Sequence, residues 1–200
     1  MKLLYWPVRI SDGAFFGWSF GEHPEAYVQF GLKGHNGQDF VIQAGKPVYA
    51  SCDGFVLYRQ DLDAQGAFKG FGNYARIENA DGWTYYAHLS KFVGKDRQVK
   101  AGEVIGLIGS TGYSSGPHLH FGFRPRINDA NNGYGGCVDP RQFLANENDL
   151  PVMNEAKIVK SKKSDTVYWC YPMPDLDYLQ KKANLEGVAL PNPFPDSDSL

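Results

Sequence analysis

Short apolar runs separated by turn residues dominate the first two thirds of the chain. The alternation in residues 73–79 and 83–88, on either side of Ala80-Asp81-Gly82, predicts a β-hairpin. Residues 47–50 and 54–58 predict a strand pair, or one bent strand, around Asp53-Gly54. Further strands are expected at 104–108 and 118–124. No helical periodicity of ten residues occurs between Gly31 and Arg126, so we expect an all-β fold with an antiparallel core and only peripheral helices.

Two segments of this region show neither the alternation of a strand nor the periodicity of a helix. Residues 61–72 and 127–136 are rich in Gly, Asn, Asp and aromatic residues, and we expect both to be irregular loops. Such loops form either ordinary surface or the walls of a binding site. Phe68, Phe71 and Tyr134 are the candidate wall residues.

The chain changes character near Asn146, where it becomes polar and rich in Pro and Lys. We therefore expect a domain at 1–145 and a C-terminal extension at 146–200. Within the extension, residues 174–187 predict one short capped helix, and residues 191–200 predict a flexible end.

Composition excludes several classes of protein. The 200 residues are 42% hydrophobic and 14% aromatic, which suits one folded domain with an appendage rather than a disordered chain. A net charge of −2 argues against nucleic acid or anionic lipid as a partner. Cys52, Cys137 and Cys170 are odd in number and form no CxxC pair, so neither a disulfide scaffold nor a thiolate metal site is expected.

The N-terminal apolar run is interrupted by Pro7 and Arg9 before it reaches the length of a signal-peptide core. No stretch approaches the roughly 18 apolar residues of a membrane span. We therefore expect neither a secretion signal nor a membrane span, and a task outside the cell would require another route.

Four of the five histidines lie in contexts that suggest chemistry. His118 and His120 are two residues apart in a strand pattern, so both imidazoles point to one face, opposite Leu119. Such a pair suits a metal ion, although an exposed strand face carries similar pairs. His35 and Asp39 flank a glycine and can reach one point from a bend, as an N/O zinc site requires, but an ordinary turn has the same pattern.

His88 ends the predicted hairpin strand, where a solitary histidine is more often structural than catalytic. His23 lies in a Gly-Glu-His-Pro turn and is expected to be a loop residue.

Taken together, these segments resemble the lysostaphin-like zinc metallopeptidases, which cleave peptide bonds in bacterial cell walls. The resemblance covers roughly residues 31–144. It is carried by GHNGQDF at 34–40, GKPVYA at 45–50, DGFV at 53–56, GNYARI at 72–77, YAHLS at 86–90, VKAGEVIG at 99–106, GSTG at 109–112, SGPHLHF at 115–121 and DPRQFL at 139–144.

The resemblance implies that His35, Asp39 and His120 hold a zinc ion, and that His88 and His118 are catalytic residues beside it. Two imidazoles and one carboxylate leave a fourth tetrahedral position open for water, as a catalytic zinc requires. The two remaining histidines can handle the proton and stabilise the oxyanion. Which of the two is the base stays open.

The resemblance further implies a zinc-dependent endopeptidase acting on the stem peptide or cross-bridge of bacterial peptidoglycan. Because no export signal is recognised, the expected routes to the wall are those of a phage lysin, a virion component or a protein exported by a non-classical path. The extension would then contact a virion or envelope partner. The alternatives are a non-catalytic structural or regulatory module that keeps the fold as a scaffold, and a zinc-binding adhesion or assembly protein.

Overall fold

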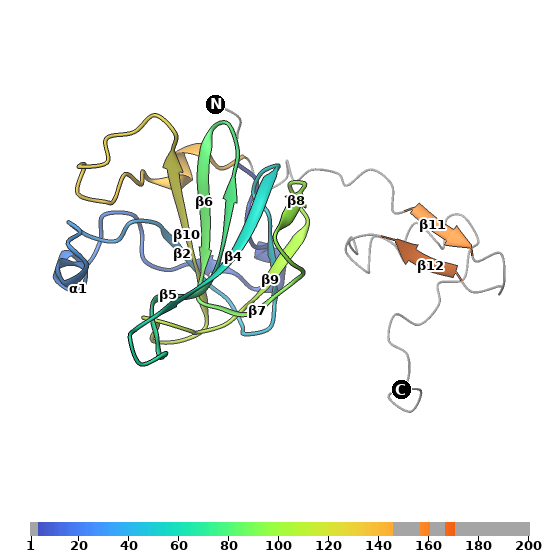
Figure 1. The fold of residues 1–200 in the computed structure, drawn as a ribbon, viewed down its shortest axis with the longest axis horizontal. Helices are drawn as coiled ribbons and strands as arrows, with labels where there is room; N and C mark the ends of the chain where they lie inside the picture. Colours follow the sequence, from blue (N-terminus) through green and yellow to red (C-terminus); the bar gives the residue numbers. More distant parts are fainter. Residues whose placement is uncertain (1–3, 146–156, 161–166, 171–200) are drawn as a thin grey trace. The chain divides into compact units, whose positions relative to one another are not determined.

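The computed structural model describes residues 4–145, 157–160 and 167–170, and its contacts divide the chain into Met1–Pro151 and Val152–Leu200 (Figure 1). In the second unit, strand β11 (Lys157–Lys160) pairs antiparallel with β12 (Val167–Cys170). The helix expected at 174–187 and the flexible end expected at 191–200 lie outside the described residues.

The first unit is built on a seven-stranded sheet and a three-stranded sheet, and every pairing between their strands is antiparallel. The large sheet has the order β1 (Phe15–Phe16), β2 (Gln38–Val41), β10 (His118–Pro125), β6 (Gly82–Ala87), β5 (Phe68–Glu78), β4 (Gly54–Leu62) and β8 (Arg97–Val99). The small sheet has the order β3 (Pro47–Tyr49), β9 (Val104–Ile108) and β7 (Leu89–Phe92).

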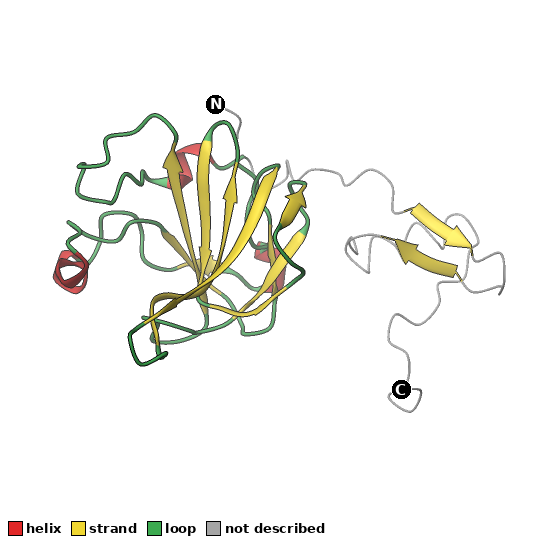
Figure 2. Cartoon of the chain, viewed as in Figure 1, coloured by secondary structure: helices red, strands yellow, loops and turns green. Residues whose placement is uncertain are grey.

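Helical segments in this unit are short and lie at its periphery, as Figure 2 shows in red. They are α1 (Pro24–Tyr27) and 3-10 turns at Ile10–Asp12, Val28–Phe30 and Pro140–Phe143. The predicted all-β class with an antiparallel core is therefore confirmed.

Strand β10 shows how the sequence pattern sets the two faces of the large sheet. Leu119, Phe121 and Phe123 are buried in the hydrophobic core. Because side chains alternate along a strand, His120 and Arg124 are directed to the opposite face. A register slip of one residue would expose the core residues, so the apolar alternation also fixes where His120 lies.

Strands form at both 47–50 and 54–58, but the expectation that they pair with each other is wrong. β3 pairs with β9 in the small sheet, whereas β4 pairs with β5 and β8 in the large sheet. The chain passes from one sheet to the other at Ser51, whose amide donates to the Tyr86 hydroxyl at 2.8 Å. A turn between sheets and a tight hairpin turn use the same residue types, which explains the error.

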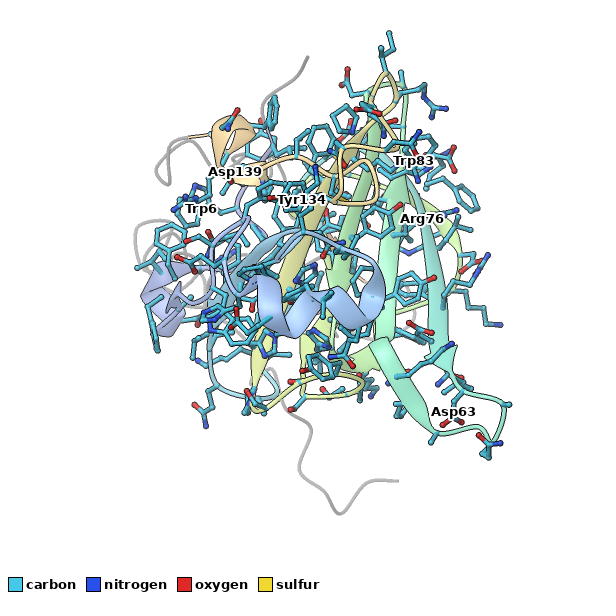
Figure 3. The ribbon with its side chains drawn as sticks, turned by 90° about the vertical axis from the view of Figure 1, so that its left-hand side faces the viewer. Trp6, Asp63, Arg76, Trp83, Tyr134 and Asp139 are labelled. Carbon is cyan, nitrogen blue, oxygen red and sulfur yellow. The ribbon has the colours of Figure 1, made fainter. Side chains whose placement is uncertain are left out.

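The expectation of an irregular loop at 61–72 is also wrong. β4 and β5 extend into this segment and stay paired as far as Leu62 and Phe68. Asp63 caps the tip of this hairpin, accepting from the amides of Gln65 and Ala67 at 2.9 and 2.8 Å (Figure 3). Glycines and a register shift after Gln60 hide the alternation in the sequence. The β5–β6 hairpin and the irregular segment at 127–136 are as predicted.

The last described residues of the first unit are tied to its N-terminus. Leu4 donates to the Phe143 carbonyl and accepts from the Ala145 amide, both at 2.7 Å, and the Trp6 indole donates to the Ala145 carbonyl at 2.8 Å. A chain ending at Ala145 is expected to fold, whereas a chain ending at Phe143 loses two of these bonds and is expected to melt about 5 °C lower or more. Thermal denaturation followed by circular dichroism compares the two, and equal melting temperatures would contradict the prediction.

Candidate metal centre

Three buried side chains from two neighbouring strands meet at one point on the outer face of the large sheet. Asp39 on β2 is the cross-strand partner of His120 on β10, and His35 lies just before β2. Asp39 Oδ1 lies 3.0 Å from His35 Nε2 and 3.1 Å from His120 Nδ1, and the two nitrogens are 2.7 Å apart. The sequence-predicted ligands His35, Asp39 and His120 are thus brought together.

The proton positions suit a metal site. His35 Nδ1 lies 3.1 Å from the Ser19 carbonyl oxygen, which accepts a hydrogen bond from it. The lone pair of His35 Nε2 is therefore directed at the centre. Burial lowers the pKa of His120, which favours the neutral ring that metal binding needs. Burial alone would raise the pKa of Asp39, but hydrogen bonds with His120 and His35 hold it well below its usual range.

These groups form a compact donor set of two imidazole nitrogens and a carboxylate oxygen, which zinc prefers. The Ser19 carbonyl orients one of the imidazoles in the way that outer-shell partners orient metal-bound histidines. The residues present therefore fit a zinc ion.

Gly37 makes the close approach of His35 and His120 possible. A Cβ at this position would lie 2.7 and 2.8 Å from His120 Cε1 and Nε2, and 2.6 Å from the Phe121 carbonyl oxygen. The glycine between His35 and Asp39 is therefore a steric requirement of the site.

Gly37→Ala is expected to displace the His120 ring and lower zinc affinity at least about 10-fold, the effect typical of disturbing a ligand's surroundings. Gly122→Ala is the matched control. Gly122 lies on β10 together with His120, but a Cβ there would approach its neighbours only to 3.6 Å or more. Competition with a chromogenic chelator measures both affinities. Equal affinities in the two variants would show that Gly37 is not needed to place the ligand.

His88 and His118 lie beside this centre without belonging to the three-residue group. Their rings are 4.6 Å apart, and His118 Nε2 lies 3.8 Å from Asp39 Oδ2. Each Nδ1 lies 2.8 Å from a backbone carbonyl, of Thr111 for His88 and of Gly116 for His118. With Nδ1 as the donor, each Nε2 is left as a proton acceptor.

His88 is held in an unusual conformation at the end of β6. Its φ of 64° lies in the left-handed region, which is uncommon for a residue with a side chain and is often found at functional sites. Burial, followed by the charges of His120 and His118, lowers the pKa of His88 to about 3. His88 is therefore neutral near pH 7.

Two clefts open beside the centre. One, of about 600 Å³, is lined by Trp18, Tyr27, Tyr113 and the Ser114–Pro117 turn and reaches Asp39, His88 and His118. The other, of about 200 Å³, runs past Tyr27, Tyr113 and Phe71 to His88 and His120. Four of the five candidate residues, all except the fully buried His35, therefore border open space that a substrate chain can enter.

Sequence reasoning found only part of these walls. Phe71 lines the smaller cleft, with its ring 5.4 Å from that of His120. Tyr134 instead stacks on Phe20 at 4.5 Å, and Phe68 lines neither cleft. Tyr27 and Tyr113 were missed, because single aromatic residues in turns carry no periodic signal.

His23, expected to be a loop residue, lies at the start of α1 and stacks on Trp18 at a centroid distance of 4.0 Å. Its Nδ1 contacts Glu25 Oε1 at 3.2 Å. Among the described residues, no side-chain hydrogen bond, ion pair or ring contact joins it to the three-residue group.

Comparisons with known proteins agree on one family. The sequence profile of Peptidase family M23 matches residues 33–136, slightly more than half of the chain. The DD-carboxypeptidase/endopeptidase Mpg of Neisseria meningitidis is 45% identical over 95 residues, which are 47% of this chain and 20% of that protein. The chain thus spans about a fifth of this relative's length.

Two solved structures share the fold. The catalytic domain of the antimicrobial peptidase lysostaphin from Staphylococcus simulans matches with a TM-score of 0.52 and 32% identity, over 66% of this chain and 92% of that domain. A zinc-containing peptidase from Vibrio cholerae matches with a TM-score of 0.53 and 33% identity, over 70% of this chain and 39% of that protein.

Proposed function

Because the chain belongs to peptidase family M23, we propose that it is a zinc-dependent endopeptidase that hydrolyses peptide bonds in bacterial peptidoglycan. The observation that carries the proposal is the meeting of His35, Asp39 and His120 at one buried point, with His88 and His118 beside it at the edge of two clefts. His35, Asp39 and His120 would hold the zinc ion.

A bound zinc ion supplies a water of lowered pKa and polarises the scissile carbonyl. The chain's own groups do the rest. His88 and His118 each present Nε2 beside the centre, with the ring fixed through Nδ1. One of this pair accepts the proton of the attacking water at Nε2, and the imidazolium formed in this way donates a hydrogen bond to the developing oxyanion and then gives the proton to the leaving amine. Trp18, Tyr27 and Tyr113 shield the reacting groups from bulk water.

A non-catalytic scaffold that keeps the peptidase fold is the alternative function. Such a module has no need for an intact donor set. All three ligand candidates and both neighbouring histidines are present and oriented here, which favours the enzyme.

For the site of action, we propose the cell wall, reached as a phage lysin, as a virion component or by non-classical export. Residues 146–200 would form a separate extension that contacts a virion or envelope partner. In the part of the chain that the structure describes, no helix is long and apolar enough to cross a membrane.

The proposed function is tested by digesting purified peptidoglycans of different cross-bridge chemistry and identifying the fragments by mass spectrometry, with and without a chelator. We expect new peptide termini in at least one wall type, their loss with chelator and their return with added zinc. Full lytic activity in excess chelator, from protein without zinc, would show that the reaction does not use the metal.

A further inference from the structure

The sheet face that carries the metal centre continues beyond it as an ordered array of side chains. Along β10, the residues on this face after His120 are Gly122 and Arg124, about 7 Å and 13 Å farther on at the usual rise per residue. Across the sheet, Tyr85 on β6 lies between Gly122 on β10 and Arg76 on β5. Figure 3 shows this face, with Arg76 labelled on its strand.

Arg76 and Arg124 flank Tyr85 on this face, because Arg76 is its cross-strand partner on β5 and Arg124 follows its partner on β10, Gly122, by two residues. Burial raises the pKa of Tyr85, and the positive charges of the two arginines oppose that rise. Two arginines therefore lie on either side of one half-buried tyrosine.

The position of Arg124 is fixed by its surroundings. Its guanidinium carbon lies 5.5 Å from the centre of the Trp83 ring, a cation–π contact. A Cβ on Gly136, in the loop that follows β10, would come within 3.0 Å of Arg124 Nε. This nitrogen is buried and has no hydrogen-bond partner in the described part of the chain.

No acidic side chain in the described part of the chain neutralises the charge of this pair. Among the described residues, no carboxylate lies within ion-pair distance of Arg76 or Arg124. Other basic side chains of this unit do pair with acids, namely Lys46, Arg59, Arg97 and Lys100. Glu78, which shares this face, pairs instead with Arg126 at 3.4 Å. Two unpaired, half-buried guanidinium groups favour an anion, and a planar carboxylate matches the guanidinium fork.

Phe71 links the smaller cleft to Tyr85, the residue between the two arginines. Phe71 forms part of that cleft's lining, and its ring lies 5.4 Å from His120 and 5.9 Å from Tyr85. A chain leaving the metal centre over Phe71 therefore reaches Tyr85 next. In the larger cleft, by contrast, the Ser114–Pro117 turn offers only neutral groups.

We propose that Arg76, Arg124 and Tyr85 form a subsite for a free carboxylate on the peptide substrate, a few residues from the bond that is cut. The proposal rests on the proposed function, and it names the substrate class as peptides that carry a free carboxylate on one side of the scissile bond. A peptide in which that carboxylate is an amide loses the charge that the arginines recognise.

The test compares two un-cross-linked stem peptides that differ only in having free or amidated carboxyl groups. Isothermal titration calorimetry measures their binding to the full zinc-loaded chain, and mass spectrometry afterwards verifies that the peptides are intact. We expect the free acid to bind about 10-fold more tightly or better, as charge-assisted hydrogen bonds to arginine allow. Arg76→Gln is expected to reduce that preference to about twofold or less.

Arg59→Gln is the matched control, since it removes the same charge from the neighbouring strand β4, where Arg59 pairs with Asp96 at 2.9 Å. It is expected to keep the preference. Circular dichroism verifies that both variants fold. Equal binding of acid and amide by the wild type, or an unchanged preference in Arg76→Gln, would overturn the subsite.

Hydrolysis of cross-linked peptidoglycan is measured in parallel, so that the two proposals fail separately. A preference for the free acid without any hydrolysis would sink the proposed function and leave the subsite standing. Hydrolysis without any preference for the free acid would overturn the subsite and leave the proposed function standing.

Discussion

His120→Ala is expected to arrive free of zinc and to lack hydrolytic activity, because it deletes one of three ligand candidates that meet within 3.1 Å of one another. Losing an outer-shell partner typically costs about 10–100-fold in metal affinity, and losing a ligand is expected to cost more. Metal content by mass spectrometry and turnover on cross-linked peptidoglycan measure both effects.

The matched control for this variant is His23→Ala, which makes the same change at a half-buried histidine outside the centre. It is expected to retain one zinc per chain. Because His120 is buried, thermal melting of both variants in excess chelator separates loss of metal from loss of fold. A folded His120→Ala protein that still holds one zinc would remove His120 from the ligand set.

The all-β class and the hairpin at β5–β6 were predictable because one face of each strand is buried. Ala75 and Ile77 on β5, and Thr84 and Tyr86 on β6, are buried and alternate with more exposed residues. This alternation can be seen in the sequence. The β4–β5 extension was not predictable in this way, since its strands project from the core and nothing forces their residues to alternate. The partner of β3 depends on a contact with β9 more than 50 residues away, which no local pattern encodes.

The site was more predictable than the fold details because its chemistry restricts residue type. His35, Asp39 and His120 can be selected from the sequence by their local frames and by the family resemblance, and the structure brings them together. The arginine pair could not be found, because Arg76 and Arg124 are 48 residues apart and meet only through strand pairing with β6. Their significance lies in the lack of a carboxylate beside them among the described residues, which only the three-dimensional structure shows.

His118→Ala is expected to retain one zinc per chain and to lose about 10²–10⁴ in turnover, the range typical of an oriented acid–base or oxyanion group. His118 stands outside the three-residue group, its Nε2 being 3.8 Å from Asp39 Oδ2, while the contacts of His35, Asp39 and His120 do not depend on it. Zinc content and kcat on a cross-linked peptide are measured beside those of His120→Ala.

The two variants separate ligand from catalyst on one strand face, where the histidines are only two residues apart. Because Gly116 orients His118 through Nδ1, the ring presents Nε2 to the cleft whether or not it binds metal, and its loss is expected to lower kcat with little change in KM. If His118→Ala is the variant without zinc, or if it is fully active, the roles assigned to His118 and His120 are wrong even though the chain remains a member of the family.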